Sequence, residues 1–330
     1  MWTILLAAVL ASQDGERLVA TIPEGVEAGS LGFSADGKIA AYTARKGDQF
    51  WVVASEWKSK PSPFPVVHVL LPSGKDILYA AFGRGSAVVY LTDTILFEIP
   101  QSTGWWFPGV VTPDGKTVLN HMRNPKTEKS AVAINGKLQT FHKGAISAPV
   151  LSADGKVFAF ALEQDDGHCV VVNDKPGPTY DWVTAPVLSA DGKVLAYGAE
   201  TDNKFFVFHG DKKLPVDLPL KGVFLSPDGA TVGWWGRAKK GDPKSGERVV
   251  VGGREGPVFA GIRPPVFSPN AKHVAYRATK ADKSWCVVVD DRTVDVEEIQ
   301  VDPVFMADGK QVGFGVRKGR ELWWKTLEVK

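Results

Sequence analysis

The sequence is poor in cysteine, in charge of one sign and in long apolar runs. Only 2 cysteines occur in 330 residues, and 39 basic against 37 acidic residues leave a net charge of +2. Such a small excess argues against a polyanionic partner such as a nucleic acid. Beyond the N-terminus, no apolar run approaches the ~18 residues that a membrane-spanning helix needs. We therefore expect neither a membrane span nor nucleic-acid binding.

The two cysteines occupy one position of a repeated pattern. Cys169 stands in the segment HCVVV and Cys286 in the segment WCVVV. If the two segments belong to different structural repeats, the sulfur atoms lie too far apart to bond, because a disulfide needs Cα atoms within about 7 Å. We expect two buried free thiols.

Signatures of catalysis and of metal or cofactor binding are also missing. The 6 histidines show no HxH or HExxH spacing, and neither a P-loop nor a GxGxxG motif at the start of a helix is present. The glycine-rich segment Gly252–Gly256 stands where a hairpin turn belongs. We predict no cofactor, no metal and no catalytic residue, although a site assembled from separate repeats would escape such a search.

The N-terminus carries a short apolar run over residues 2–11. Val9 and Ala11 fit the −3 and −1 positions of a signal-peptidase site, which predicts a signal peptide over residues 1–11 with cleavage before Ser12. Export would place the protein in the periplasm or outside the cell. No Lys or Arg precedes this run, so the alternative is an apolar strand or helix packed on a cytoplasmic domain.

What the sequence does contain is a six-residue motif that recurs along the whole chain. Its copies are spaced by 37 to 42 residues. The eight copies are Phe33–Lys38 (FSADGK), Leu70–Lys75 (LLPSGK), Val111–Lys116 (VTPDGK), Leu151–Lys156 (LSADGK), Leu188–Lys193 (LSADGK), Leu225–Ala230 (LSPDGA), Phe267–Lys272 (FSPNAK) and Phe305–Lys310 (FMADGK). A repeat of this length organises the entire chain, so composition alone does not set the number of domains.

The chemistry of the motif is that of a hairpin turn. The Asp side chain can bond to the backbone two residues on, and Gly takes the positive φ that returns the chain. Six copies carry this carboxylate, namely Asp36, Asp114, Asp154, Asp191, Asp228 and Asp308. We interpret these residues as turn caps rather than as a ring of cation ligands. Ala271 replaces the glycine of the seventh copy, and we expect that turn to be distorted.

Each repeat contains four short apolar segments around its turn, which is the pattern of one blade of a β-propeller. We predict an all-β fold, a closed propeller most simply of eight four-stranded blades, filling residues 12–330 as a single, monomeric domain. Seven blades are the alternative, because Ser73 replaces Asp in the second motif. The last repeat ends one strand short, and residues 17–23 resemble a fourth strand. We expect them to complete the last blade beside residues 321–328.

The motif, followed by an apolar strand with Ala-Tyr or Ala-Phe, resembles the WD-like bacterial propeller repeats of the TolB type. The segment Arg263–Tyr276 carries this resemblance best, and the resemblance as a whole extends over residues 17–330. The same repeats occur in the propellers of prolyl-oligopeptidase-like enzymes, but the Gly-x-Ser-x-Gly motif of their hydrolase domain does not occur here. The resemblance implies a propeller without an attached hydrolase and without the N-terminal domain of TolB.

The candidate binding residues lie where inner strands begin. Four residues fall at the equivalent entry positions of their repeats or within two places of them, and we expect these residues to line the mouth of the central channel. They are Lys221, Arg263, Asp302 and His68. Trp105 and Trp106 precede an inner strand, and we expect them to lie in a loop at one rim of the ring, as candidates for stacking on a ligand or partner. The pairs at 234–235 and 323–324 are expected to pack between blades.

Function should reside in the irregular loops opposite the motif turns. These loops are acidic in the fourth and fifth repeats and basic elsewhere, most strongly over residues 237–248. We expect a non-enzymatic scaffold that binds a protein or another macromolecule through this loop-rich face. The alternative is a propeller enzyme, such as a polysaccharide lyase or a glycosidase, with its site in the central channel.

Overall fold

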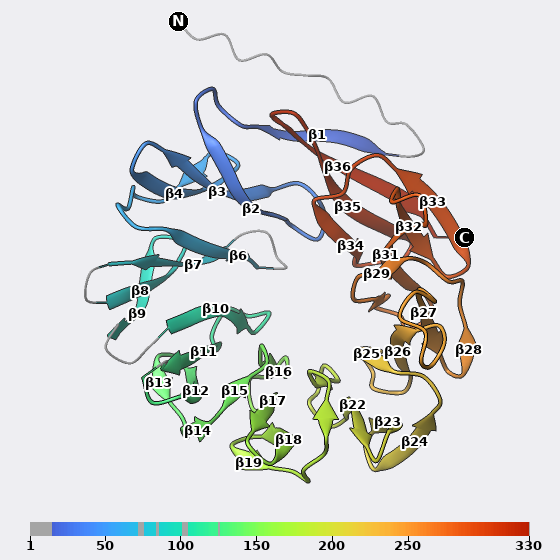
Figure 1. Cartoon of the computed structure of the whole chain (residues 1–330). Helices are drawn as coiled ribbons and strands as arrows, with labels where there is room; N and C mark the ends of the chain where they lie inside the picture. The colour runs from blue at the N-terminus through green and yellow to red at the C-terminus, as the bar shows by residue number, and fades with distance from the viewer. Residues whose placement is uncertain (1–14, 72–75, 84–85, 101–104, 125, 330) are drawn as a thin grey trace, which may run out of the picture.

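A computed structural model describes residues 15–71, 76–83, 86–100, 105–124 and 126–329. Within these ranges the regular elements are all β-strands, and they form eight antiparallel sheets. Figure 1 shows the sheets following one another around a ring, from the blue N-terminal blades to the red C-terminal ones. The prediction of an eight-bladed propeller is confirmed. The seven-bladed alternative is wrong, because the second repeat forms a full blade.

The blades are numbered 1 to 8 in chain order, and the last blade takes its fourth strand from the N-terminus. The innermost strands are β2 (Glu27–Phe33), β6 (Val66–Leu70), β10 (Trp105–Val111), β15 (Ala145–Ile146) with β16 (Val150–Leu151), β20 (Trp182–Val183) with β21 (Val187–Leu188), β25 (Leu220–Leu225), β29 (Gly261–Ile262) with β30 (Val266–Phe267), and β34 (Val301–Phe305). The second strands are β3 (Ala40–Lys46), β7 (Ile77–Phe82), β11 (Val118–Asn124), β17 (Phe158–Gln164), β22 (Leu195–Thr201), β26 (Val232–Arg237), β31 (Val274–Thr279) and β35 (Gln311–Lys318).

The outer half of each blade holds two further strands. The third strands are β4 (Gln49–Ala54), β8 (Ser86–Leu91), β12 (Lys129–Ile134), β18 (Gly167–Val172), β23 (Lys204–His209), β27 (Glu247–Val251), β32 (Trp285–Val289) and β36 (Glu321–Glu328). The outermost strands are β5 (Trp57–Lys58), β9 (Thr94–Pro100), β13 (Lys137–Leu138), β19 (Lys175–Pro176), β24 (Lys212–Val216), β28 (Arg254–Glu255), β33 (Arg292–Val296) and β1 (Glu16–Thr21). In blade 3 an extra strand, β14 (His142–Lys143), pairs with β12.

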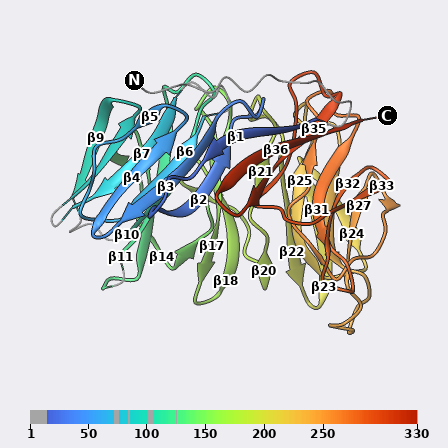
Figure 2. The same ribbon diagram turned by 90° about the horizontal axis from the view of Figure 1, so that it is seen from above.

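The two ends of the chain close the ring together. β1 pairs antiparallel with β36, so the expected completion of the last blade by an N-terminal strand is confirmed. Figure 2 shows blue β1 lying along red β36 and β35. Blades 1 and 8 also pack directly, since the Phe33 and Trp324 rings lie 5.2 Å apart. The pairing covers the edge of β36, and the ring contact buries the facing surfaces of the first and last blades.

The core is divided among the spaces between blades rather than gathered in one centre. Buried apolar residues form eight clusters, and each lies between two neighbouring blades. In blade 7, for example, Tyr276 and Val288 face blade 6, whereas Ala275 and Val287 face blade 8. This alternation follows from the two-residue period of a strand, and it makes each blade dependent on both neighbours.

The motif turns have the predicted chemistry. In blade 4 the Ser152 hydroxyl donates to Asp154 at 2.7 Å, and the same carboxylate accepts the Lys156 backbone N–H at 3.1 Å. These two bonds, led by that of Ser152, lower the pKa of Asp154 to about 2. The seventh turn is not distorted, so that expectation is wrong. Ala271 itself adopts a φ of 58°, and its N–H donates to Ser268 O at 2.9 Å as glycine does elsewhere.

The predictions for the two cysteines and for the tryptophan pair at 234–235 are also confirmed. Cys169 in blade 4 and Cys286 in blade 7 are both buried and free. Trp234 and Trp235 pack on opposite faces of blade 6, against the clusters shared with blades 5 and 7.

The structure does not test the proposed signal peptide, because residues 1–14 lie outside the described ranges. Within those ranges no helix is long and apolar enough to cross a membrane.

Candidate functional site

The loop-rich mouth of the ring is built from irregularities in the inner strands. Pairing between first and second strands shifts register in blades 1, 3, 6 and 8, and the inner strand divides in two in blades 4, 5 and 7. A bulge leaves backbone groups without ladder partners and re-aims the side chains at that point. The predicted mouth residues Lys221, Arg263 and Asp302 all stand at such interruptions.

In blades 4 and 5, neutral hydroxyl groups supply the hydrogen bonds that the interrupted inner strand lacks. The Ser147 hydroxyl accepts the Ala161 N–H at 3.0 Å and donates to the Ala148 carbonyl at 3.1 Å. The Thr184 hydroxyl accepts the Gly198 N–H at 2.8 Å. Both side chains therefore replace missing ladder bonds inside their own blade.

Blade 6 places a charged bridge at the same level. Lys221 on β25 donates to the Glu247 carboxylate on β27, which is only 8% exposed. The second Glu247 oxygen accepts the Ile262 N–H of blade 7 at 3.0 Å. Lys221 is thus not a free channel lysine, because its charge is bound to a buried carboxylate that also ties blade 6 to blade 7.

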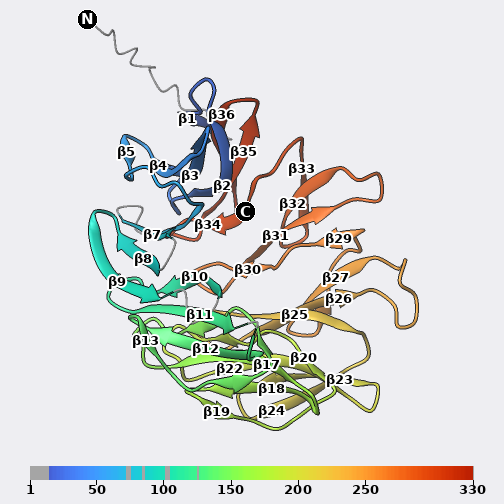
Figure 3. The same ribbon diagram turned by 60° about the vertical axis from the view of Figure 1, so that its left-hand side comes forward.

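Blades 7 and 8 are joined by two arginines that share one carboxylate. The Arg263 Nε lies 3.4 Å from Asp302 Oδ2, and the Arg277 Nε lies 3.1 Å from Asp302 Oδ1. Asp302 lies on β34, Arg277 on β31 and Arg263 between β29 and β30, and both β30 and β31 contact β34. Figure 3 shows β30 and β34 next to each other. Arg277 further donates to the Ile299 carbonyl at 3.1 Å and lies over the Trp285 ring. The group carries one surplus positive charge, and the Arg263 side chain is 60% exposed.

His68 links blades 1 and 2. Its Nδ1 lies 3.5 Å from the Ser30 hydroxyl on β2. Burial lowers the pKa of His68 to about 4, so the imidazole is neutral at pH 7. All four predicted mouth residues therefore contact a neighbouring blade directly or through one intermediate side chain.

Trp105 and Trp106 lie within an inner strand rather than in a loop. They are the first residues of β10, and their backbones pair with Arg123 and Met122 of β11. The loop placement expected from the sequence is therefore wrong, because the pairing extends to the very start of this segment. The two side chains lie outside the described part of the chain.

Further along the inner strands the channel wall becomes apolar. A cavity of about 420 Å³ lies against blades 3 to 7, and none of its described lining residues is charged. Its wall includes Val110, Val150, Leu188, Phe224, Val266 and Phe267. The polar mouth and the apolar wall are only three or four residues apart along a strand, roughly 10–13 Å at ~3.3 Å per residue.

The loops around the mouth carry opposite charges on neighbouring blades. In blades 4 and 5, Glu163, Asp166 and Asp202 are exposed and have no ion pair among the described residues. The long blade 6 loop carries Lys239, Lys240 and Lys244, also exposed. This loop reaches towards blade 5, since Lys240 Nζ donates to the Asn203 carbonyl at 2.9 Å. The acidic and basic loops therefore meet on the loop-rich face.

Sequence reasoning missed the partners of the predicted residues, namely Glu247, Arg277 and Ser30. A signal for Glu247 was present. Equivalent third-strand positions in blades 1, 5, 7 and 8 carry Phe50, Phe205, Trp285 and Leu322, so a carboxylate in this register is out of place. Arg277 and Ser30 offered no comparable signal, because nothing in the repeat indicates which residue of one blade will contact Asp302 or His68 in another.

The described residues contain no group of three or more His, Cys, Asp or Glu side chains placed to hold a metal ion. Comparison with known proteins returns no matching family model and no matching curated sequence. The expected propeller is therefore shown by structure, whereas membership of the TolB type stays a prediction.

Solved structures match over nearly the whole chain. A eukaryotic initiation factor aligns at TM-score 0.56 and 17% identity, covering 94% of this chain and 91% of that one. The Dos1 propeller aligns at 0.55 and 10%, covering 96% and 94%. An oligogalacturonate lyase in complex with manganese aligns at 0.51 and 13%, covering 96% of each chain. Identities this low establish the propeller fold alone, and the functions in these names differ widely.

Proposed function

We propose that this propeller is a non-enzymatic platform that binds a protein partner through its loop-rich face. The observation that carries the proposal is the juxtaposition of uncompensated acidic and basic loops over blades 4 to 6. Exposed charges that form no intramolecular ion pair remain free to pair across an interface. A partner with the reverse arrangement, basic opposite Glu163 and Asp166 and acidic opposite Lys240, would be both attracted and oriented.

The mouth residues suit such a platform. Lys221 and Asp302 hold adjacent blades together, so they keep the surrounding loops in place. Arg263 adds an exposed cation beside the same face. A rigid scaffold that presents loops loses little conformational entropy when it binds. With the expected signal peptide, the platform would act as a monomer in the periplasm or outside the cell.

The proposal is tested with a double charge reversal, Glu163→Lys with Asp166→Lys. Its control, Glu98→Lys with Asp211→Lys, makes the same charge change at exposed positions away from the loop-rich face. Wild type and both variants are coupled to resin and exposed to an extract of the source organism. Retained proteins are identified by mass spectrometry, and each candidate is then purified and titrated by calorimetry at two salt concentrations.

The expected result is a protein that wild type and the control bind equally and the loop variant binds at least about tenfold more weakly, with an affinity that falls as salt rises. Equal binding by all three proteins would refute this use of the face. Cleavage of polygalacturonate or another polysaccharide by wild type would favour the enzyme alternative instead.

A further inference from the structure

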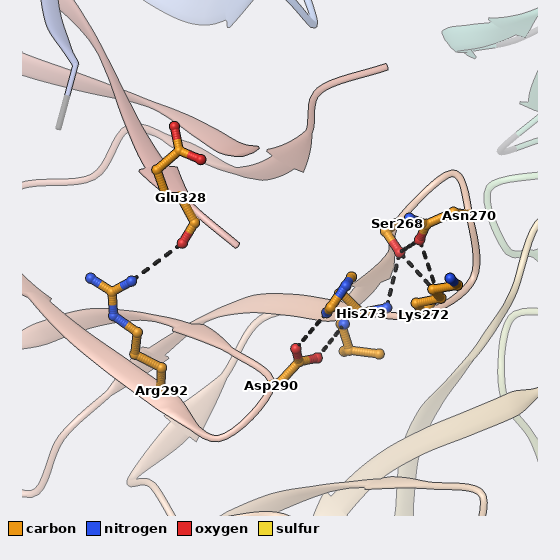
Figure 4. A network of polar contacts seen from close by, with 8 residues as sticks. Ser268, Asn270, Lys272, His273, Asp290, Arg292 and Glu328 are labelled. Carbon is orange, nitrogen blue, oxygen red and sulfur yellow. Dashed lines mark hydrogen bonds and ion pairs between the residues drawn. The ribbon is translucent and has the colours of Figure 1, made fainter. Parts of the chain in front are cut away.

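The seventh motif departs from the other copies at two consecutive positions, and an unusual residue follows it. Asn270 stands where six copies carry Asp, Ala271 stands where seven carry Gly, and His273 follows the motif. Figure 4 shows the resulting contacts. The Ser268 hydroxyl still bonds to Asn270 at 2.7 Å, so the turn survives while its charge changes. This turn lies on the face opposite the charged loops.

His273 is held by the neighbouring hairpin of the same blade. Its Nδ1 lies 2.7 Å from Asp290 Oδ2, and Asp290 Oδ1 accepts the Val274 N–H at 2.9 Å. In the neutral imidazole Nδ1 must donate to this carboxylate, which leaves Nε2 as a hydrogen-bond acceptor. The carboxylate thus fixes both the position of the ring and the atom that it presents.

These residues line a cavity of about 550 Å³ between blades 6 and 7. Its apolar lining includes Val251 of blade 6 and Phe267 and Tyr276 of blade 7. Burial, with smaller effects of Cys286 and Asp291, raises the pKa of Tyr276, so its hydroxyl remains a donor. The volume lies in the range of about 300–1,000 Å³ that is typical of small-molecule sites.

Charges of both signs line the same cavity without neutralising one another. Lys156 and Lys193 pair with the carboxylates of their own turns at 3.1 Å. The turn of Lys272 has the neutral Asn270 in place of that carboxylate, and Asn270 accepts only the Lys272 backbone N–H. Among the described residues neither Lys272 nor Arg254 forms an ion pair, and Asp291 also lacks one. Of the other two acidic residues of the wall, Glu255 is already paired with Arg248 and Asp290 with His273. The cavity therefore offers cations and an anion that are both free.

We propose that this cavity binds a small zwitterion with an apolar body, such as a short peptide with free termini. The ligand carboxylate pairs with Lys272 and Arg254. The ligand ammonium pairs with Asp291 and donates to Nε2 of His273. The apolar body contacts Val251, Phe267 and Tyr276. This site lies on the turn face and is independent of the partner surface proposed above.

The test uses the full chain and the dipeptide L-leucyl-L-phenylalanine in isothermal titration calorimetry. Two analogues with the same body remove one charge each, the N-acetylated form and the C-terminal amide. Each analogue is expected to bind about tenfold or more weakly than the free dipeptide, because each leaves a charged group of the cavity unpaired.

Variants connect the binding to this cavity. Lys272→Met and Asp291→Asn are each expected to weaken dipeptide binding about tenfold. Lys193→Met and Asp211→Asn make the same changes at the equivalent positions of blade 5 and are expected to leave it unchanged. Val251→Phe fills the cavity and is expected to abolish binding, with circular dichroism confirming that the variant is folded.

Three results would overturn the proposal. No binding at about 10 mM dipeptide would exclude this ligand class. Binding of the N-acetylated form as tight as that of the free dipeptide would indicate an anion site instead. Equal losses in blade 5 and blade 7 variants would place the binding elsewhere.

Discussion

Blades 4 and 5 and blades 6 to 8 solve one structural problem with different chemistry. In all five, the inner strand is interrupted at the same level of the ring. Blades 4 and 5 fill the gap with the hydroxyls of Ser147 and Thr184, which bond within their own blade. Blades 6 to 8 use Lys221, Arg263 and Asp302, whose ion pairs link neighbouring blades, through Glu247 in the case of Lys221.

The difference shows that the interruption itself is architectural, because a neutral hydroxyl is sufficient to maintain it. The charged residues at this level are found in blades 6 to 8 and are not needed to maintain the interruption. They couple blades 6, 7 and 8 and place a surplus cation at the mouth. The same blades also carry the long basic loop and the altered seventh motif, so the chemical irregularity of the molecule is concentrated there.

The largest effect is expected when the charged bridge is broken. Lys221→Met leaves the buried Glu247 carboxylate without its cation and should lower the free energy of unfolding by about 2–3 kcal/mol. Urea unfolding followed by circular dichroism measures this loss. Lys193→Met removes an exposed ion pair and should cost less than about 0.5 kcal/mol. Equal losses would mean that the blade 6 bridge contributes no more than a surface pair.

Acid tests the neutral bridge between blades 1 and 2. The pKa of His68 is about 4 in the folded protein, against an ordinary value near 6.5. Below about pH 6.5 the unfolded chain takes up a proton that the folded one does not, so stability falls until about pH 4. His68→Gln should remove about 2 kcal/mol of this fall. Unfolding curves at pH 7 and pH 4.5 give the difference, and an unchanged pH slope would contradict the prediction.

A smaller loss is expected at the hydroxyl-filled gap. Thr184→Val keeps the shape of the side chain but leaves the buried Gly198 N–H without an acceptor, which should cost about 1.5 kcal/mol. Thr293→Val makes the same change at an exposed position and should be nearly neutral. A loss of stability for Thr184→Val as large as that for Lys221→Met would remove the contrast between blades 4 and 5 and blades 6 to 8.

The smallest effect concerns the seventh turn. Ala271 adopts a φ of 58°, which costs a residue with a Cβ atom more than it costs glycine. Ala271→Gly should therefore stabilise the protein by about 0.5–1 kcal/mol. Gly115→Ala is the reciprocal change, because only flexible leucine side chains approach that site, and it should destabilise by about 1 kcal/mol. Thermal denaturation of both variants measures the pair, and shifts of the same sign would refute the argument.

Much of the fold could be predicted because its signals are local. Each turn contains its own Ser, Asp and Gly, and each strand shows its alternation within a few residues, so the repeat could be counted directly. Counting the strands of the last repeat also showed that its blade lacks a fourth strand, which β1 supplies. Ala271 was misjudged because a glycine preference was treated as a requirement, whereas the surrounding hydrogen bonds hold alanine in the same conformation.

The candidate site was less accessible from the sequence. Positions equivalent to Lys221 and Arg263 could be found by aligning repeats, but their partners lie 26 and 39 residues away. Trp105 and Trp106 were assigned to a loop because nothing in the sequence marks where pairing with β11 begins.

The sequence by itself determined the repeat, its turns and its strands, because each depends on interactions within about 40 residues. The structure decided between seven and eight blades. Only the tertiary structure decided which charges meet. Closing the ring brings Asp302 against two arginines of blade 7, and it sets Lys272 and Asp291 around one cavity with Arg254 of blade 6. These contacts join residues of different repeats. The regular spacing of the repeats reveals the fold, but it does not indicate which side chains will meet.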